Sequence, residues 1–241
     1  MAEQMSQSFG AEVDAYDRAR PDYPRDAVHW LLGDAHRVAD VGAGTGKLSA
    51  VIAELGREVI AIEPDDAMRS MCRRRLPDIE VFDGSGEHLP LPDSSVDAVT
   101  FGQAWHWVDP QLACAEAARV LRPDGVLALM WNVRDQTVDW VDQLTTVANA
   151  QNGEGLALVN PPAFTAPFQR AENQRWSWTR DITPQELVDL MVSRTSVITA
   201  DSQTRAEIIN GVRHLLATHP GTADRQVLQL PYVTTAWKLQ P

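Results

Sequence analysis

The strongest signal in this 241-residue chain is the stretch Val38-Ala39-Asp40-Val41-Gly42-Ala43-Gly44-Thr45-Gly46-Lys47. Its apolar beginning predicts a strand, and glycines at alternate positions predict a tight turn into a helix. A second apolar strand, residues 58–63, ends in the acid Glu63, which follows Gly42 at the distance where a ribose-binding carboxylate is found. Because glycine lets the backbone approach a ligand closely, the two strand ends together predict a site for an adenosine.

The glycine spacing discriminates among adenosine-containing ligands. A dinucleotide motif, G-x-G-x-x-G, would place glycine where this chain has Lys47. A P-loop has four residues between its glycines and a Ser or Thr after its lysine, whereas Leu48 follows here. Neither a pyrophosphate nor a triphosphate cradle is therefore predicted. A nicotinamide-dependent oxidoreductase and a non-catalytic cofactor-binding regulatory protein stay open as alternatives.

Strand and helix patterns alternate along the chain, which predicts an α/β fold with a parallel sheet and right-handed crossovers. Pro231, inside the last apolar run, indicates an irregular or edge position for that strand. Asp65 is the expected N-cap of the helix after the second strand. Strands are expected at 37–41, 58–63, 79–82, 96–101, 125–131, 175–179 and 227–239, and helices at 26–32, 47–55, 111–121, 133–150, 184–191 and 204–216.

Four motifs lie at successive expected strand ends or turns: Asp40–Gly46, Glu63-Pro64, Gly86-Glu87-His88-Leu89-Pro90 and Leu121-Arg122-Pro123-Asp124-Gly125. In this combination the chain resembles the class I S-adenosylmethionine-dependent methyltransferases, and most closely the small-molecule branch that contains the trans-aconitate and ubiquinone/menaquinone-type enzymes. The family usually has glycine where this chain has Asp124.

The resemblance implies a doubly wound, seven-stranded, mostly parallel Rossmann-like sheet with helices on both faces and a C-terminal antiparallel strand. It also implies S-adenosyl-L-methionine as cofactor. The expected activity is methyl transfer, by in-line displacement, to an oxygen, carbon or nitrogen of a small-molecule acceptor.

The resemblance also assigns cofactor-binding roles. Gly42 and Gly44 would approach the methionine and ribose parts, and Glu63 would accept both ribose hydroxyls. Asp40 would anchor the turn or meet the ammonium group through water. The remaining expected cofactor-binding residues are Tyr16 and Arg20 at the methionine carboxylate, Pro64 and Met68 near the adenine, Gly86 and Glu87 in the adenine loop, and Gln103 after the fourth strand.

The segment after the fourth strand is where the acceptor is expected. Trp105 and Trp107 can wall a dry pocket by stacking. His106 can take a proton from an acceptor hydroxyl, which would make it the catalytic residue, or it can form a hydrogen-bonding part of the pocket wall. Both interpretations of His106 stay open.

Composition limits the partners. The formal net charge is −12 at pH 7, so neither a nucleic acid nor an anionic membrane surface is expected as partner. Cys72 and Cys114 lie in helical patterns and are expected as reduced, buried thiols, without a disulfide or metal site. No apolar run of about 18 residues and no signal-peptide pattern is present, so a cytoplasmic protein is expected. It is expected to be a monomer or a homodimer.

One domain in four parts is predicted. Residues 1–36 would form a cofactor-covering segment and the first helix, and residues 37–132 the cofactor-binding core. Residues 133–170 would be a helical insertion that shapes the acceptor pocket, and residues 171–241 would complete the sheet.

Overall fold

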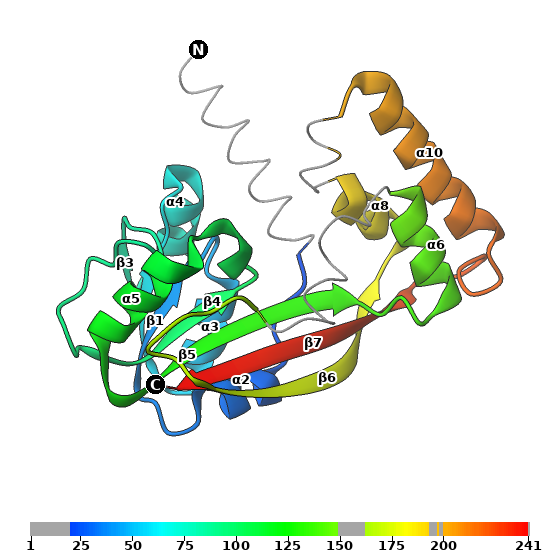
Figure 1. Cartoon of the computed structure of the whole chain (residues 1–241). Coiled ribbons are helices and arrows are strands. Elements are labelled where there is room, and N and C mark those ends of the chain that lie inside the picture. Colours follow the sequence, from blue (N-terminus) through cyan, green and yellow to red (C-terminus); the bar gives the residue numbers. More distant parts are fainter. Residues whose placement is uncertain (1–19, 149–161, 193–196, 198–199, 241) are drawn as a thin grey trace, which may run out of the picture. The chain divides into compact units, whose positions relative to one another are not determined.

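The computed structural model describes residues 20–148, 162–192, 197 and 200–240 (Figure 1). Its contacts divide the chain into two compact units. The core unit comprises Asp22–Asn132, Pro162–Trp176 and Thr234–Pro241, and the second unit comprises Met1–Pro21, Val133–Pro161 and Ser177–Val233. All the predicted site residues except Tyr16 and Arg20 belong to the core unit. The four-part division of the sequence stays a prediction.

The chain forms a seven-stranded sheet, as the sequence predicts, and its strands lie in the order β3-β2-β1-β4-β5-β7-β6. Four neighbouring pairs, β1–β2, β2–β3, β1–β4 and β4–β5, are parallel, and the C-terminal strand is antiparallel. The strands are β1 Arg37–Val41, β2 Glu58–Ile62, β3 Glu80–Phe82, β4 Val96–Gly102, β5 Leu121–Arg134, β6 Arg170–Ile182 and β7 Leu228–Gln240. Because the first five strands are parallel, their carboxyl ends meet at one edge, where open α/β sheets bind ligands.

Helices connect and cover these strands (Figure 1). They are α2 Arg25–Leu32, α3 Lys47–Glu54, α4 Asp66–Arg75, α5 Pro110–Val120, α6 Asp139–Val147, α8 Pro184–Val192 and α10 Ser202–Thr218, with the 3₁₀ helix η1 at Trp105–Trp107. The Asp65 side chain accepts a hydrogen bond from the Met68 N–H, which confirms the predicted N-cap of α4. Leu31 and Ile52, on α2 and α3, pack against Val38 and Ala98 of β1 and β4.

The predicted helix at 133–150 begins too early. β5 continues through Arg134 as a buried strand, and α6 begins only at Asp139. The reason is tertiary: β5 lies beside the long strand β7, and the Asp135 N–H just beyond it donates to the Pro231 carbonyl.

The edge position that Pro231 indicates is also wrong, because β7 lies between β5 and β6. Pro231 is near the beginning of β7, and its carbonyl is used by Asp135 although it has no N–H to donate. Asp124 lies within β5, where the pairing with β4 is irregular between Leu121 and Val126, and its φ is +66°, the left-handed conformation that glycine usually supplies and that Asp tolerates.

An ion pair on α5 holds the loop that follows β3. The Glu116 carboxylate accepts from the Leu89 N–H at 2.8 Å and from the Arg119 guanidinium. Arg119 in turn donates to the carbonyls of Leu89 and Leu91 and to Asp93. These bonds, with the Arg119 hydrogen bond first among them, lower the pKa of Glu116 to about 2.

We expect Glu116→Gln to lower the free energy of unfolding at pH 7 by about 1–3 kcal/mol, because charge-assisted hydrogen bonds are lost. Because the pKa of Glu116 is lower in the folded state than its ordinary value of 4.5, the ionised carboxylate stabilises the folded protein above pH 4.5. This stabilisation is lost as the pH falls from 4.5 towards 2. The difference between variant and wild type in urea unfolding should therefore shrink over that range. Glu54→Gln, in a largely exposed pair with Arg25, is the control and should change stability by less than about 1 kcal/mol.

Candidate cofactor site

The glycine turn after β1 has the geometry that a close-lying ligand requires. Gly42 and Gly44 have φ values of +66° and +59°, which L side chains rarely adopt. A Cβ at Gly42 would lie 2.6 Å from the Ala104 Cβ, whereas a Cβ at Gly44 would meet no atom of the described residues within 4 Å. Gly42 is therefore needed for packing against the segment after β4. Within the described part of the chain, Gly44 instead faces open space, where a ligand can approach the backbone.

Asp40 anchors this turn from inside the protein. It is 1% exposed, and its carboxylate accepts from the Ser49 hydroxyl at 2.5 Å and the Thr100 hydroxyl at 3.0 Å. Burial raises the pKa of Asp40 to about 6, although both hydroxyls act in the opposite direction. Of its two predicted roles, anchoring the turn is the one that this geometry supports.

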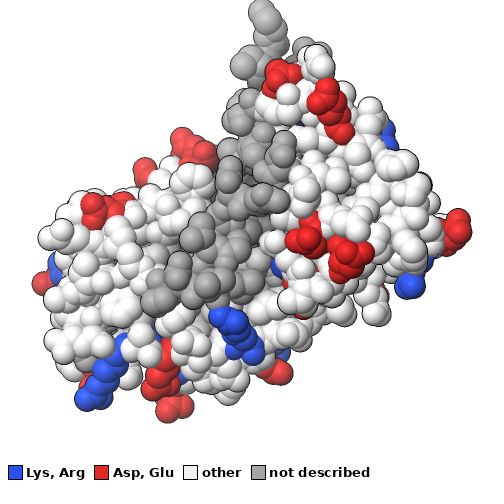
Figure 2. Space-filling model, turned by 45° about the vertical axis from the view of Figure 1, so that its right-hand side comes forward, with Lys and Arg blue, Asp and Glu red and all other residues white. Residues whose placement is uncertain are grey.

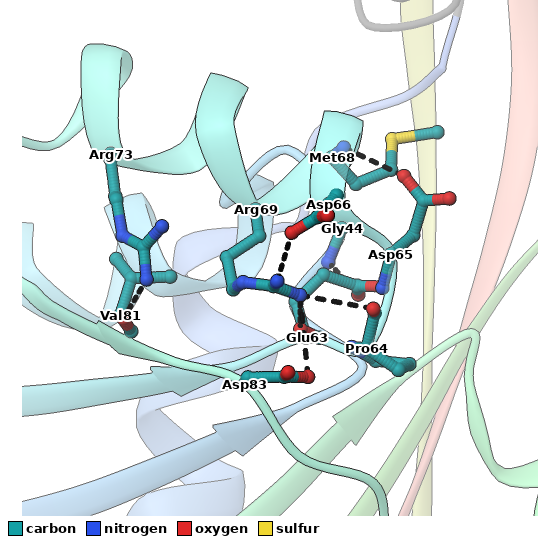
Figure 3. Close-up of polar contacts among 10 residues, drawn as sticks. All are labelled: Gly44, Glu63, Pro64, Asp65, Asp66, Met68, Arg69, Arg73, Val81 and Asp83. Atoms are coloured by element: carbon teal, nitrogen blue, oxygen red, sulfur yellow. Dashed lines mark hydrogen bonds and ion pairs between the residues drawn. The ribbon is translucent and has the colours of Figure 1, made fainter.

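Glu63 lies just past β2, with its carboxylate against the glycine turn (Figure 3). Its Oε2 accepts from the Gly44 N–H at 2.8 Å, and its Oε1 accepts from the Asp65 N–H at 2.9 Å. Each carboxylate oxygen has two acceptor positions, so both oxygens retain capacity for a ribose hydroxyl. The acid that the sequence predicts as ribose-binding therefore stands beside Gly44, the turn glycine whose added Cβ would meet no described residue.

At Gly86, the loop after β3 is closely packed. A Cβ at Gly86 would lie 2.8 Å from Val108 and 3.0 Å from Phe101, so this position has room only for glycine. The Glu87 carboxylate accepts from the Asp109 N–H at the beginning of α5. Glu87 thus ties the loop to α5, and a contact with adenine stays a prediction for both residues.

Pro64 and Met68 flank the beginning of α4. Pro64 is exposed and its carbonyl accepts from Arg69. Met68 is half-buried, and its N–H is used by the Asp65 cap. Their predicted packing near the adenine stays a prediction.

After β4, Gln103 forms a left-handed turn with a φ of +59°. Its N–H donates to the Met130 carbonyl, and its side-chain amide donates to the Asn132 carbonyl at 2.8 Å. These bonds fix Gln103 at the carboxyl end of β5, at the sheet edge that also holds the glycine turn.

In the aromatic segment that follows, Trp105 is buried, whereas His106 and Trp107 are exposed. Trp105 is 4% exposed, packs edge-on against Phe101, and donates its indole N–H to the Ala163 carbonyl. His106 is exposed and its ring contacts Trp107, which is 74% exposed. The two tryptophans therefore differ in burial within the core unit, and their place in an acceptor pocket stays a prediction.

The N-terminal segment is described only in part. Tyr16 lies outside the described residues, and Arg20 is half-buried at the beginning of the described chain, in the second unit. Their predicted contact with the methionine carboxylate stays a prediction.

Four residues for which the sequence predicts no role make contacts near the glycine turn: Asp22, Tyr23, Lys47 and Asn132. The Lys47 ammonium pairs with Asp22 at 2.7 Å, and the Asn132 side chain donates to the Asp22 carbonyl. The Tyr23 hydroxyl lies so close to Gly102 that a Cβ there would be 2.7 Å away. In the sequence, only the position of Lys47 directly after the glycine turn pointed to these contacts.

Within the described parts of the chain, no group of three or more His, Cys, Asp or Glu side chains could hold a metal ion. Cys72 and Cys114 are both buried free thiols. No helix in the described ranges has the length and apolar character that crossing a bilayer requires.

A doubly wound sheet with a glycine turn after its first strand and an acid after its second defines a class of proteins that hold an adenosine-containing cofactor. Comparison with known proteins narrows that class. A family model described as a methyltransferase domain matches residues 39–129. An uncharacterized methyltransferase of Mycobacterium tuberculosis is 46% identical over 231 residues, which cover 95% of this chain and 94% of the relative.

More distant proteins match nearly the full length of this chain. An uncharacterized methyltransferase of Schizosaccharomyces pombe is 28% identical over 97% of this chain and 96% of its own. A solved structure from Anaeromyxobacter dehalogenans, described as a type II methyltransferase, superposes with a TM-score of 0.66 at 24% identity, covering 91% of this chain and 97% of that one. The chain belongs to the family of S-adenosylmethionine-dependent methyltransferases, and S-adenosyl-L-methionine is its cofactor.

The open space at Gly44 can be tested against a second glycine of the same chain. Gly56 also has a positive φ, of +78°, and no described residue within 4 Å of an added Cβ, but it lies after α3, at the opposite end of that helix from Gly44. Gly44→Ala and Gly56→Ala should both lose about 1–2 kcal/mol of stability to the left-handed conformation.

Only Gly44→Ala should also weaken S-adenosylhomocysteine binding in calorimetric titration, by roughly tenfold or more, because the methyl group takes up space beside the ligand. Equal affinities of the two variants would show that the cofactor does not approach Gly44.

Proposed function

We propose that this methyltransferase transfers the methyl group to an oxygen, carbon or nitrogen of a small molecule. Its cofactor would lie along the carboxyl ends of β1 to β4, with Gly44 and Glu63 at the ribose. The supporting observation is that the Glu63 carboxylate, which can still accept hydroxyl hydrogen bonds, stands directly against Gly44, where no described residue lies within 4 Å of an added Cβ. The family assignment replaces the nicotinamide-dependent and non-catalytic alternatives.

The charge of the protein supports a small acceptor over a nucleic acid. The formal net charge is −12, and on the face in Figure 2 Lys and Arg side chains are scattered among acidic ones instead of forming a continuous patch. A nucleic-acid acceptor would need many cations at its phosphates. A demethylmenaquinone methyltransferase of Renibacterium salmoninarum, 40% identical over 105 residues and 43% of this chain, is a relative whose named acceptor is a small molecule.

When bound, the cofactor would supply a methyl group on a sulfonium; displacement at that methyl group releases S-adenosylhomocysteine, a neutral thioether and a good leaving group. The protein then has to align the acceptor behind that methyl group and keep the site dry. Gly44 and Glu63 would hold the donor from the β1 and β2 side. His106 and Trp107, which are exposed after β4, would meet the acceptor, with Trp105 as the buried support of that segment.

An acceptor screen tests the proposed substrate class. Purified protein with radiolabelled S-adenosyl-L-methionine should methylate at least one member of a panel of small carboxylic acids, quinols, phenols and amines. Oligonucleotides and unfolded total protein serve as comparison acceptors and should stay unlabelled. Label that enters only the polymers would overturn the small-molecule proposal.

His106→Gln should raise the KM for the acceptor by roughly fivefold, because one hydrogen bond contributes about 1 kcal/mol. S-adenosylhomocysteine affinity should not change. If the rate of the wild type falls at acidic pH and that of the variant does not, the imidazole accepts a proton in the reaction. The control is His29→Gln, exposed on α2. Unchanged kinetics in His106→Gln would remove His106 from the acceptor site.

A further inference from the structure

We propose that Arg69 is a positioning residue for the cofactor: it holds the main chain after β2 so that the Glu63 carboxylate meets the ribose. This inference rests on the proposed role of Glu63. Arg69 is on α4 and is 7% exposed, which is unusual for an arginine and requires that its charge be paired and its donors be used.

Figure 3 shows the Arg69 guanidinium pointing from α4 towards the end of β2. Its Nη1 donates to the Glu63 carbonyl at 2.8 Å and to the Pro64 carbonyl at 2.9 Å. The same nitrogen lies 3.4 Å from Asp83, at the beginning of the loop after β3, and Nη2 pairs with Asp66. One side chain thus joins α4, the end of β2 and the loop after β3.

These contacts differ in weight. The side chains of Asp66 and Asp83 are 94% and 73% exposed, so their ion pairs with Arg69 contribute little. The bond to the Glu63 carbonyl is buried, and removing its donor would leave a carbonyl without that partner away from water. The main-chain bonds are therefore the part of the Arg69 interaction that fixes structure.

With Arg69 in place, every polar group of Glu63 is held. Its N–H donates to the Phe82 carbonyl, its carbonyl accepts from Arg69, and its two carboxylate oxygens accept from Gly44 and Asp65. The backbone bonds fix where the Cα lies, and the carboxylate bonds fix the side chain. Loss of the Arg69 bonds would free the main chain at Glu63 and Pro64 and let the carboxylate move relative to the glycine turn.

Arg73 provides a matched control one turn further along α4. Its guanidinium also donates to a strand carbonyl, that of Val81 on β3 at 2.7 Å, and in Figure 3 no dashed line joins it to the end of β2. Arg69→Met and Arg73→Met therefore remove the same chemical group from the same helix. Arg69→Lys keeps the charge, although an ammonium cannot reproduce the geometry of the guanidinium.

The measurement is calorimetric binding of S-adenosylhomocysteine and of its analogue without the ribose 2′-hydroxyl, with thermal unfolding as a folding check. The dissociation constant of the analogue divided by that of S-adenosylhomocysteine reports how much the 2′-hydroxyl contact contributes to binding. In Arg69→Met the affinity for S-adenosylhomocysteine should fall about tenfold and that for the analogue should fall less, so the ratio decreases. Arg73→Met should keep the wild-type ratio, and Arg69→Lys should lie between.

Glu63→Gln separates this inference from the function on which it rests. If Glu63→Gln keeps the wild-type ratio, the ribose assignment itself is wrong. If Glu63→Gln lowers the ratio but Arg69→Met and Arg69→Lys do not, Arg69 has only a structural role. An equal decrease in Arg73→Met would also overturn the inference. The double variant Glu63→Gln/Arg69→Met should have the same ratio as Glu63→Gln alone.

Discussion

The carboxylate of Asp40, buried at the end of β1, joins three elements through two hydrogen bonds. It accepts from Ser49 on α3 and from Thr100 on β4, so the strand, the helix and the neighbouring strand are fixed at one point. The glycine turn is the segment between Asp40 and Ser49, and both of its ends are tied to that carboxylate. Burial raises the pKa of Asp40 because this anchor lies away from water. The turn can therefore keep its left-handed glycines without support from a ligand.

The rest of the site is built outwards from that turn. Gly44 donates to Glu63, and Glu63 accepts from Asp65 at the beginning of α4. Arg69 returns from α4 to the main chain of Glu63, which closes a loop of contacts between β1, β2 and α4. A carboxylate held in this way loses little conformational freedom when a ribose binds, and such preorganisation favours affinity.

Local signals made much of the fold predictable. The apolar runs at 37–41 and 58–63 correspond to β1 and β2 almost residue for residue, and Asp65 caps α4 as its residue type suggests. Prediction was wrong where a distant partner decides the outcome. Residues 133 and 134 extend β5 because β7 lies beside that strand, and Pro231 lies inside the sheet because β6 forms on its other side.

Among the residues of the core site, too, some were predictable from local sequence and others depend on distant partners. The glycines, Glu63 and the strand-end order were readable from spacing along the chain, because each is set by a turn between adjacent elements. Arg69 and the different burial of Trp105 and Trp107 were not readable, because the partners that decide them come from other segments: carbonyls after β2 for Arg69 and the Ala163 carbonyl for Trp105. Periodicity along a chain records which groups are neighbours in sequence, whereas a buried hydrogen bond requires its donor and acceptor to be brought together by folding.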